Sequence, residues 1–414
     1  VEDGKRQVSS FQALMISTAS RVGTGNIAGI ATAIAAGGPG AVFWMWVMAV
    51  IGSASAFIES TLAQVYKTKD GKDFRGGPSY YMEKALGKRW MGVLFSVLLI
   101  ICFAYGFNGL QSYNMSSALE YYIPGYSESS YPMIVGLILA VGTGLIIFGG
   151  VHRIGFITSV MVPIMAGAYL LMGLFTIVTH LPQLPGIFAM ILSEAFDFQA
   201  IFGGMAGSAV VIGIKRGLFS NEAGMGSAPN AAASASVSHP AKQGMVQVIS
   251  VFIDTLLICS ATAMMLLLSG VQGEAGVLDG IPFVQKAISA NVGTWGIHFI
   301  TASIFAFAFS SLIGNYYYAE SNILFIKNNK VLLFVFRCTC LLAVFLGAQA
   351  DFSLVWNLAD ITMGCMAIVN IIAILLLGNI ALKVLKDYET QKKAGKNPVF
   401  KAENVGIKNT DCWK

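Results

Sequence analysis

Long apolar stretches alternate with short polar connections along the whole chain. Ten of these stretches reach the roughly 20 residues that an α-helix needs to cross the hydrocarbon core of a bilayer. They lie near residues 10–37, 40–66, 90–120, 131–150, 155–178, 201–235, 241–269, 294–325, 331–349 and 353–382. This pattern predicts an all-α polytopic membrane protein with ten spans.

Two connections are longer than a simple turn. They predict short helices at the membrane interface, one over Gly76–Met82 and the other over residues 281–291. The segment from about Lys386 onward is polar and rich in lysine, so we expect it to be loosely ordered.

Charges in the connections indicate the topology. Connection 67–89 carries seven lysines and arginines, and more bases lie in alternate connections and in the tail from Lys383. The other connections hold mainly acidic residues, among them Glu120 and Glu194. Because cytoplasmic connections are enriched in Lys and Arg, we expect a multi-pass protein of the cell membrane with connection 67–89, the tail and both chain ends in the cytoplasm.

Composition excludes several classes of protein. With 56% hydrophobic and 11% charged residues, the 414-residue chain belongs in a lipid bilayer and is not a soluble globule. The net charge of +5 lies mostly in connections and tail, so it reports topology and not nucleic-acid binding. The six cysteines lack metal-ligand spacing, and no nucleophile–base pattern predicts an enzyme. A cation channel is disfavoured because no filter motif or ring of pore charges is visible.

The first span is interrupted at Arg21-Val22-Gly23-Thr24-Gly25-Asn26. Glycines are poor helix formers, and an Arg and an Asn at membrane depth are costly. Such a break is tolerated where the freed backbone groups are buried in protein or hold a ligand. Close packing of helices at the glycines is the alternative interpretation.

A second copy of this pattern lies 195 positions further along. Arg21, Asn26, Ala28 and Gly29 align with Arg216, Asn221, Ala223 and Gly224, and Glu59 aligns with Asp254 in the same register. Five spans separate the copies, so the two halves insert with opposite topology, as in inverted-repeat transporters. We therefore divide the chain into a flank (1–9), a first five-span repeat (10–180), a second inverted repeat (181–385) and a cytoplasmic tail (386–414).

Two broken helices that face each other suit a zwitterion. A half-helix that begins at a break presents N–H groups to an anion, and one that ends there presents carbonyls to a cation. A carboxylate on the N–H groups and an ammonium on the carbonyls make an α-amino acid the simplest substrate of this shape.

Several motifs together resemble the alanine/glycine:cation symporter family, also called the sodium:alanine symporter family. They are the runs at 23–29, 37–46 and 216–224, with supporting matches at 10–13 and 76–78. The resemblance covers residues 10–380 and implies the leucine-transporter-like five-plus-five fold, with spans 1 and 6 broken at mid-membrane. It also implies Na⁺-coupled import of alanine or glycine by alternating access.

Members of that family usually carry one more hydrophobic span before the position of Ser10. The printed sequence begins Val1-Glu2-Asp3 without an initiator methionine. We therefore expect that it does not start at the native N-terminus.

Candidate substrate ligands come from both breaks and from span 3. For the carboxylate we choose Gly23, Thr24, Gly25 and Asn26, since glycines let backbone N–H groups approach and a threonine hydroxyl adds a donor. For the ammonium group and the pocket shape we choose Phe219, Ser220 and Asn221. In span 3, Gln111 shares a helix face with Asn108, and packing between helices is as good an explanation for that polar pair as substrate contact.

The resemblance also implies a sodium site between span 1 carbonyls and paired hydroxyls of span 8. Hard cations take oxygen ligands. The hydroxyls of Ser310 and Ser311 with the carbonyls of Ala19 and Val22 are the predicted ligands. The alternative is that the serines bond back onto their own helix.

Charged residues inside the spans need partners. The repeat predicts the pairs Arg21–Glu59 and Arg216–Asp254. Proton coupling is the alternative to sodium coupling, with Glu59, Asp254 or Asp360 as the carrier. Asp360 could also serve as a gate or as a plain polar contact, and the sequence leaves that choice open.

Overall fold

The computed structural model describes residues 8–71, 73–197 and 208–413. Seven helices of this part are long and apolar enough to cross a bilayer: residues 40–65, 89–117, 153–179, 240–267, 295–326, 330–347 and 352–393. The other three predicted spans correspond to two broken helices and to a shorter apolar helix over Tyr131–Ile147. All ten predicted spans therefore correspond to helical segments, although residues 1–7 of the predicted flank and 201–207 of the sixth predicted span lie outside the described residues.

The first half of the chain opens with the broken helix. Its elements are α1 (Ser10–Arg21), η1 (Thr24–Asn26), α2 (Ala28–Gly37), α3 (Gly40–Val65), β1 (Thr68–Asp70), β2 (Asp73–Arg75), α4 (Pro78–Lys84), α5 (Arg89–Leu99), η2 (Ile100–Phe107), α6 (Asn108–Ser117), η3 (Tyr126–Glu128), α7 (Tyr131–Ile147), α8 (Gly150–Thr179), η4 (Leu181–Gln183) and α9 (Leu184–Ala195). Strands β1 and β2 form an antiparallel hairpin in which Lys69 pairs with Phe74.

The second half repeats this order of elements. It consists of α11 (Ala209–Asn221), α12 (Pro229–Ser234), α13 (Pro240–Phe252), η6 (Ile253–Cys259), α14 (Ser260–Leu267), α15 (Gly280–Val292), α16 (Trp295–Ile326), α17 (Lys330–Gly347), α18 (Phe352–Lys393) and η7 (Ala402–Val405). A broken helix, a continuous helix, a short helix and a long helix follow one another in both halves. This order agrees with the predicted repeat, while the inverted relation and the boundary at 180/181 stay predictions.

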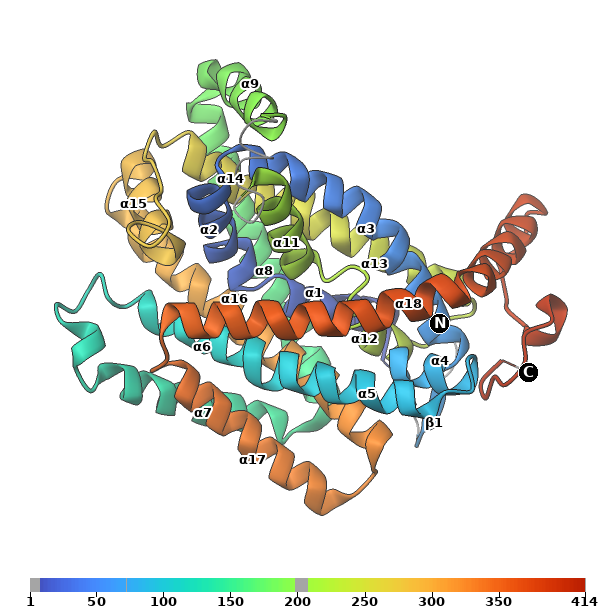
Figure 1. Cartoon of the computed structure of the whole chain (residues 1–414). Helices are drawn as coiled ribbons and strands as arrows, with labels where there is room; N and C mark the ends of the chain where they lie inside the picture. The colour runs from blue at the N-terminus through green and yellow to red at the C-terminus, as the bar shows by residue number, and fades with distance from the viewer. Residues whose placement is uncertain (1–7, 72, 198–207, 414) are drawn as a thin grey trace.

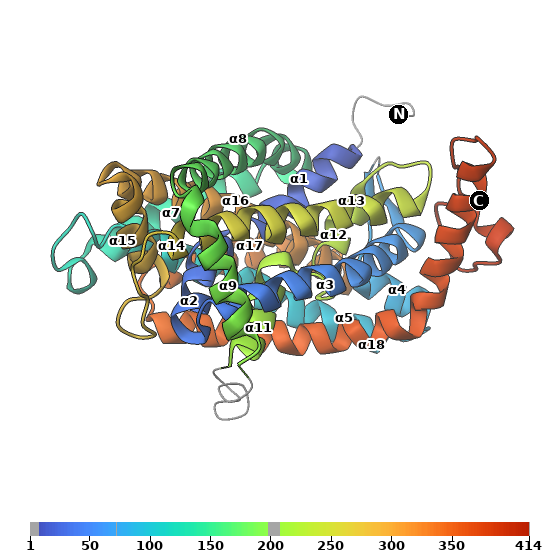
Figure 2. The same cartoon turned by 90° about the horizontal axis from the view of Figure 1, so that it is seen from above.

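The long helices run side by side in one bundle (Figures 1 and 2). In this bundle α3 packs against α11 and α13, α1 against α8 and α16, and α17 against α6 and α7. We call the end that carries β1, β2 and residues 394–413 the tail end, and the opposite end, which carries α15, the far end (Figure 1). Both broken helices lie within the bundle, so their free backbone groups are shielded from lipid, as the bilayer requires.

Glycines produce the second break. Helix α11 ends where Glu222 adopts a left-handed conformation at φ 53°, and Gly224 and Gly226 follow at φ 84° and 86°. These φ values favour glycine because it has no Cβ to clash. The chain resumes as α12 at Pro229, a residue suited to the first turn of a helix.

Short helices are present at both predicted positions, as α4 and α15, and their location at the membrane interface stays a prediction. Helix α9 was not predicted, because this stretch was interpreted as a connection that carries acidic residues such as Glu194. Trp44 of α3 donates its indole N–H to the carbonyl of Ala195 at the end of α9 (2.9 Å), which ties this helix to the bundle.

The expectation of a loosely ordered tail is wrong. Helix α18 continues to Lys393, and the chain then folds back along the tail end. Phe400 and Trp413 are buried, and the Trp413 indole donates to the carbonyl of Gln64 at 2.7 Å. The Phe400 N–H donates to the carbonyl of Ser238 at 2.9 Å. The burial of these two aromatic side chains holds the polar segment in place, because burying a large ring offsets part of the conformational entropy lost when the segment is ordered.

Candidate functional site

The two breaks meet in the middle of the bundle. The Asn26 amide of the first break donates to the Ser220 hydroxyl of the second at 3.0 Å and to the Asp254 carboxylate of η6 at 2.6 Å. The Asn26 carbonyl accepts from the Thr262 hydroxyl at 2.6 Å. All four side chains are fully buried. Residues of both predicted half-sites thus share one polar cluster.

The predicted N–H groups of the first break bind amide oxygens. The Gly23 N–H donates to Asn26 Oδ1 at 3.0 Å, and the Thr24 N–H donates to Gln111 Oε1 at 3.1 Å. Asn114, one helical turn beyond Gln111, donates to the Thr24 hydroxyl at 2.9 Å. Asn114 was not among the predicted residues, although its spacing from Gln111 places both on one face of α6. These N–H groups form an acceptor-binding corner in which a carboxylate could replace the amide oxygens.

Glycines at the first break leave no space for side chains. A Cβ on Gly25 would lie 2.5 Å from the ring of Phe219, and one on Gly23 would lie 2.3 Å from the Ser311 hydroxyl oxygen. The Phe219 ring also packs against Phe107 (4.7 Å between centroids) and Trp356 (5.3 Å). An aromatic cluster therefore limits the volume beside the N–H groups, and two of its members, Phe107 and Trp356, were missed because single aromatics in apolar spans carry no distinctive signal.

Hydroxyls of α16 reach the last turn of α1. Ser311 Oγ lies 3.0 Å from the carbonyl oxygen of Ala19 and 3.1 Å from that of Ser20. Ser310 Oγ lies 3.5 Å from the Ala19 oxygen and 2.8 Å from the carbonyl of Phe307 in its own helix. Val22 follows as the buried C-cap of α1. The cluster presents only neutral oxygen donors, which fits a hard cation such as Na⁺.

The predicted pair Arg21–Glu59 is not formed. Glu59 accepts from the N–H groups of Gly224 (3.2 Å) and Gly226 (3.0 Å) and from the Asn370 amide (2.8 Å). Arg21 donates one bond, to Gln247 at 3.0 Å, while its Nε and Nη2 have no partner among the described residues. The glycine turn offers a carboxylate two fixed N–H groups, so Glu59 fills the anion site that the second break creates.

The predicted pair Arg216–Asp254 is also wrong. Arg216 and Lys215 both pair with Asp360 of α18, at 2.7 and 2.6 Å. The Arg216 guanidinium also stacks 4.4 Å from the Trp356 ring centroid. The Ser220 hydroxyl donates to Asp254 at 2.7 Å, in addition to Asn26. Arg216 lies one turn before the break and faces α18, whereas Asp254 lies beside the break itself.

Asn221, proposed for the ammonium group, caps its own helix end. Its Oδ1 accepts from the N–H of Ala223 at 3.0 Å. Asn108 donates to Cys340 Sγ at 3.4 Å and accepts from Asn315 at 3.1 Å, so it packs between helices. The substrate roles of the eight predicted residues and the sodium roles of the other four stay predictions.

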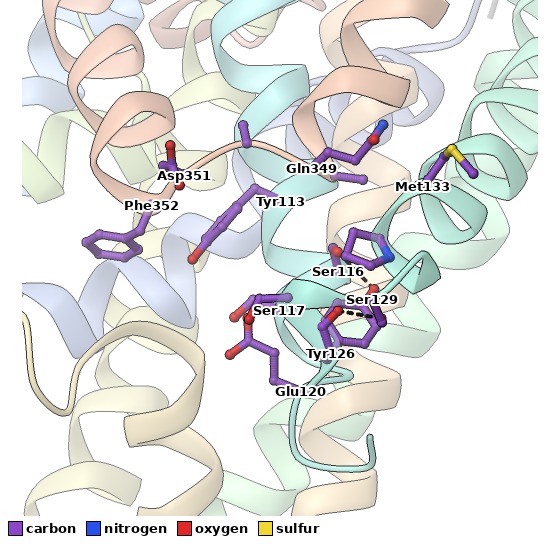
Figure 3. Close-up of a pocket in the computed structure, with 14 residues that line it drawn as sticks. Tyr113, Ser116, Ser117, Glu120, Tyr126, Ser129, Met133, Gln349, Asp351 and Phe352 are labelled. Carbon is purple, nitrogen blue, oxygen red and sulfur yellow. Dashed lines mark hydrogen bonds between the residues drawn. The ribbon is translucent and has the colours of Figure 1, made fainter. Parts of the chain in front are cut away.

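A separate pocket of about 370 Å³ lies at the far end of the bundle. Figure 3 shows Tyr113 of α6 between Glu120 and the α17–α18 connection, which carries Gln349 and Asp351. Partial burial raises the pKa of Glu120 above its ordinary value. This polar pocket is remote in the sequence from both breaks, and we assign it no role in substrate binding.

Solved structures with similar folds define the class of the protein. A mutant of the manganese transporter of Eremococcus coleocola superposes with a TM-score of 0.56 at 13% identity, over 96% of this chain and 84% of that one. The structure of MhsT in complex with L-phenylalanine gives a TM-score of 0.51 at 14% identity, over 91% of this chain and all of that one. These similarities show the fold, which is that of the leucine-transporter-like class, with two broken helices that meet in a polar centre.

Comparison with protein families then identifies the family. The model of the sodium:alanine symporter family matches residues 1–402. The amino-acid carrier protein AlsT and the probable sodium/glutamine symporter GlnT, both of Bacillus subtilis, are each 50% identical to this chain; they cover 100% and 99% of it and 87% and 84% of their own lengths. A sodium/proton-dependent alanine carrier of Bacillus sp. is 37% identical, over 98% of this chain and 94% of its own length. The chain belongs to the sodium:alanine symporter family, and it is a transporter and not an enzyme.

Proposed function

We propose that this protein imports alanine, and glycine by the same site, together with Na⁺ by alternating access. One observation carries the proposal: the oxygen cluster of Ser311 and Ala19 lies directly before the N–H groups of Gly23 and Thr24 along the first break. A cation site and a carboxylate site that share one break favour joint binding of a cation and an amino acid. Family membership supports the same substrates.

The substrate carboxylate is placed on the N–H groups of Gly23 and Thr24. Both groups donate to side-chain amide oxygens in this structure. A carboxylate is the stronger acceptor, because bonds to a charged group are about twice as strong as neutral ones. Binding of the carboxylate to the Thr24 N–H then requires the Gln111 side chain to rotate away from Thr24, so the conformation of Gln111 changes when the substrate binds.

The ammonium group is placed toward Ser220 and Asp254. Asp254 is a buried carboxylate beside the break, within 2.7 Å of the Ser220 hydroxyl. Its negative charge attracts an ammonium group in a region that excludes water. The contact between Phe219 and Gly25 leaves little room beside this position, which favours a hydrogen atom or a methyl group as the substrate side chain.

Sodium is placed on the carbonyls of Ala19 and Val22 and on the hydroxyls of Ser310 and Ser311. These groups belong to α1 and α16, so a bound ion would hold the two helices together while the substrate binds. The positive-inside pattern places the tail end in the cytoplasm. One Na⁺ with a zwitterion moves one net charge, so the membrane potential contributes about 2.3 kcal/mol per 100 mV to import.

Two relatives support alternatives for the substrate and for the coupling ion. GlnT, whose name specifies glutamine, is as identical in sequence to this chain as AlsT is, at 50%. The Bacillus sp. carrier is named sodium/proton-dependent. Glutamine transport and proton coupling are therefore the second candidates.

Uptake into proteoliposomes separates these candidates. Labelled alanine should accumulate under an inward Na⁺ gradient, and unlabelled glycine should compete with it more strongly than glutamine does. Equal accumulation under a proton gradient without Na⁺ would overturn sodium coupling. Stronger competition by glutamine than by glycine would overturn the assignment of a small substrate.

A further inference from the structure

Glu222 is a buried acid at the second break, and the site described above leaves it without a role. Glu222 is 1% exposed and occupies the left-handed position that ends α11. Oε1 lies 2.9 Å from the hydroxyl of Ser20 in α1, and Oε2 lies 2.6 Å from the hydroxyl of Ser227. The carboxyl group thus joins the two breaks.

With the amides of Asn315 and Asn108 oriented as in this structure, the hydrogen bonds around Ser20 require one more hydrogen than is available when Glu222 is ionised. The Ser20 hydroxyl oxygen lies 2.9 Å from Glu222 Oε1 and 2.7 Å from Asn315 Oδ1. A hydroxyl has a single hydrogen, and ionised carboxylates and amide oxygens only accept. The Asn315 amide nitrogen donates in the other direction, to Asn108 Oδ1 at 3.1 Å. One of the two short contacts to Ser20 therefore needs a hydrogen from its other partner.

A protonated Glu222 supplies that hydrogen. The carboxyl O–H donates to the Ser20 oxygen, the Ser20 O–H donates to Asn315, and the Ser227 O–H donates to the remaining carboxyl oxygen. Every short contact then has one donor and one acceptor. With Glu222 ionised, two acceptors would face each other across Ser20 in a buried site, which is costly.

The other two buried acids of this region have a different environment. Glu59 accepts from three N–H donors, and Asp254 accepts from the Asn26 amide and from the hydroxyls of Ser220 and Thr255 (3.0 Å for Thr255). Cys259 Sγ lies 3.2 Å from the Asn26 amide nitrogen and 3.0 Å from the Ser220 hydroxyl, but its thiol carries a hydrogen of its own, so these contacts do not leave two acceptors facing each other. Their surroundings fit the ionised form.

Charge balance agrees with this assignment. The titratable groups that face Glu222 are Arg21 of α1, Asp254 of η6, Tyr318 of α16 and Cys102 of η2, and Glu59 of α3 binds the glycine turn that follows. With Glu222 neutral, these groups comprise one guanidinium and two carboxylates, which leave a single net negative charge. An ionised Glu222 would add a second uncompensated charge, and such charges are expensive in a buried region.

We propose that Glu222 is a proton-binding site that joins α1 to the second break and through which pH acts on the transporter. The proton sits on Oε1 and bonds to Ser20. When it dissociates, it leaves as H⁺ to water and the carboxylate keeps the electron pair of the O–H bond. Ser20 then lies between two acceptors, so the contacts from α1 to Asn315 and to Glu222 cannot both persist. Deprotonation therefore disfavours this closed arrangement of the two breaks.

Infrared difference spectroscopy of the purified full chain tests the proton directly. The spectrum of the wild type minus that of Glu222→Gln at neutral pH should contain the carbonyl stretch of a protonated carboxylic acid. Labelling with ¹³C-glutamate should shift this band. Glu59→Gln is the matched control and should lose carboxylate bands instead. Loss of carboxylate bands in Glu222→Gln would overturn the proposal, because both amides would then be rotated and Asn315 would donate to Ser20.

Transport gives a second readout. A glutamine at 222 donates to Ser20 and accepts from Ser227 as the protonated acid does, so Glu222→Gln should keep Na⁺-driven uptake and lose the alkaline decline expected of the wild type. Glu222→Ala removes both bonds and should reduce uptake by about tenfold or more. The same alkaline decline in the wild type and in Glu222→Gln would overturn the proposal. The inference rests on the transporter proposed above, but the infrared test needs no transport, so the two can fail separately.

Discussion

Ser311→Ala tests the proposed sodium site most sharply. The Ser311 hydroxyl is the α16 group with the closest approach to α1, at 3.0 Å from the Ala19 oxygen and 3.1 Å from the Ser20 oxygen. The substitution removes one oxygen and adds no bulk, so the fold should persist. Ser310→Ala should have a smaller effect, since that hydroxyl lies 2.8 Å from a carbonyl of its own helix and 3.5 Å from Ala19.

The magnitude follows from the loss of one oxygen–cation interaction. A hydrogen bond or dipole contact to a charged group contributes about 1.5–3 kcal/mol. Since about 1.4 kcal/mol corresponds to tenfold, the Na⁺ concentration for half-maximal alanine uptake should rise about 10- to 150-fold in Ser311→Ala. The maximal rate at saturating Na⁺ should change much less, because the substitution leaves the substrate groups intact.

The assay is the initial rate of alanine uptake into proteoliposomes at a series of Na⁺ concentrations. Ser303→Ala is the matched control on the same helix, because its hydroxyl donates only to the carbonyl of Phe299, at 2.8 Å. Reconstituted protein is quantified in each case, so that a folding defect is separated from a change in affinity. An unchanged Na⁺ dependence in Ser311→Ala would refute the site.

Three further predictions concern packing, buried charge and pH. Gly25→Ala places a methyl group 2.5 Å from the Phe219 ring. The resulting overpacking costs about 1–3 kcal/mol and should lower the initial uptake rate, and adding Phe219→Leu should restore part of that rate. An unchanged rate in Gly25→Ala would show that the ring does not limit the pocket. Asp360→Asn leaves Arg216 in a buried site without a full negative charge, so the melting temperature in detergent should fall, and fall less when Arg216→Gln accompanies it; equal melting temperatures of the wild type and the single variant would contradict this. Burial lowers the pKa of Lys67 to about 7. Above that pH the folded state binds fewer protons than the unfolded state, so the free energy of unfolding should rise from about pH 7 toward the ordinary lysine pKa. Lys67→Met should abolish this rise in thermal unfolding measured at a series of pH values, and an identical pH dependence in the variant would refute the assignment.

The spans and the breaks could be predicted because they are local properties of the sequence. A bilayer requires each spanning segment to satisfy its own backbone hydrogen bonds, so about 20 apolar residues already predict a helix. Glycines beside a polar residue at membrane depth mark a break for the same reason. The 195-residue offset then related the two breaks, and the structure brings Asn26 and Ser220 within 3.0 Å of each other.

The partners of the buried charges could not be predicted in this way. The repeat suggested partners by symmetry, but Glu59 binds the N–H groups of a glycine turn and Arg216 binds Asp360. A charged side chain on a helix points toward one neighbouring helix. Which helix that is depends on how the packed helices are rotated and at which angle they cross, and a single segment does not encode this. The same holds for the tail, whose two aromatic anchors bind at the end of α3 and in the connection before α13, more than 150 positions away.

The sequence by itself determined the class of the protein, the ten apolar segments, the two breaks and the family, because hydropathy and motif spacing act along the chain. Only the tertiary structure decided which buried polar and charged groups lie in contact with one another. Ser20, Glu222 and Asn315 are far apart in the sequence, and Glu222 and Asn315 compete for the Ser20 hydrogen only because the fold places an oxygen of each within 3 Å of the Ser20 hydroxyl. In a buried region, those distances decide which protonation state is favoured.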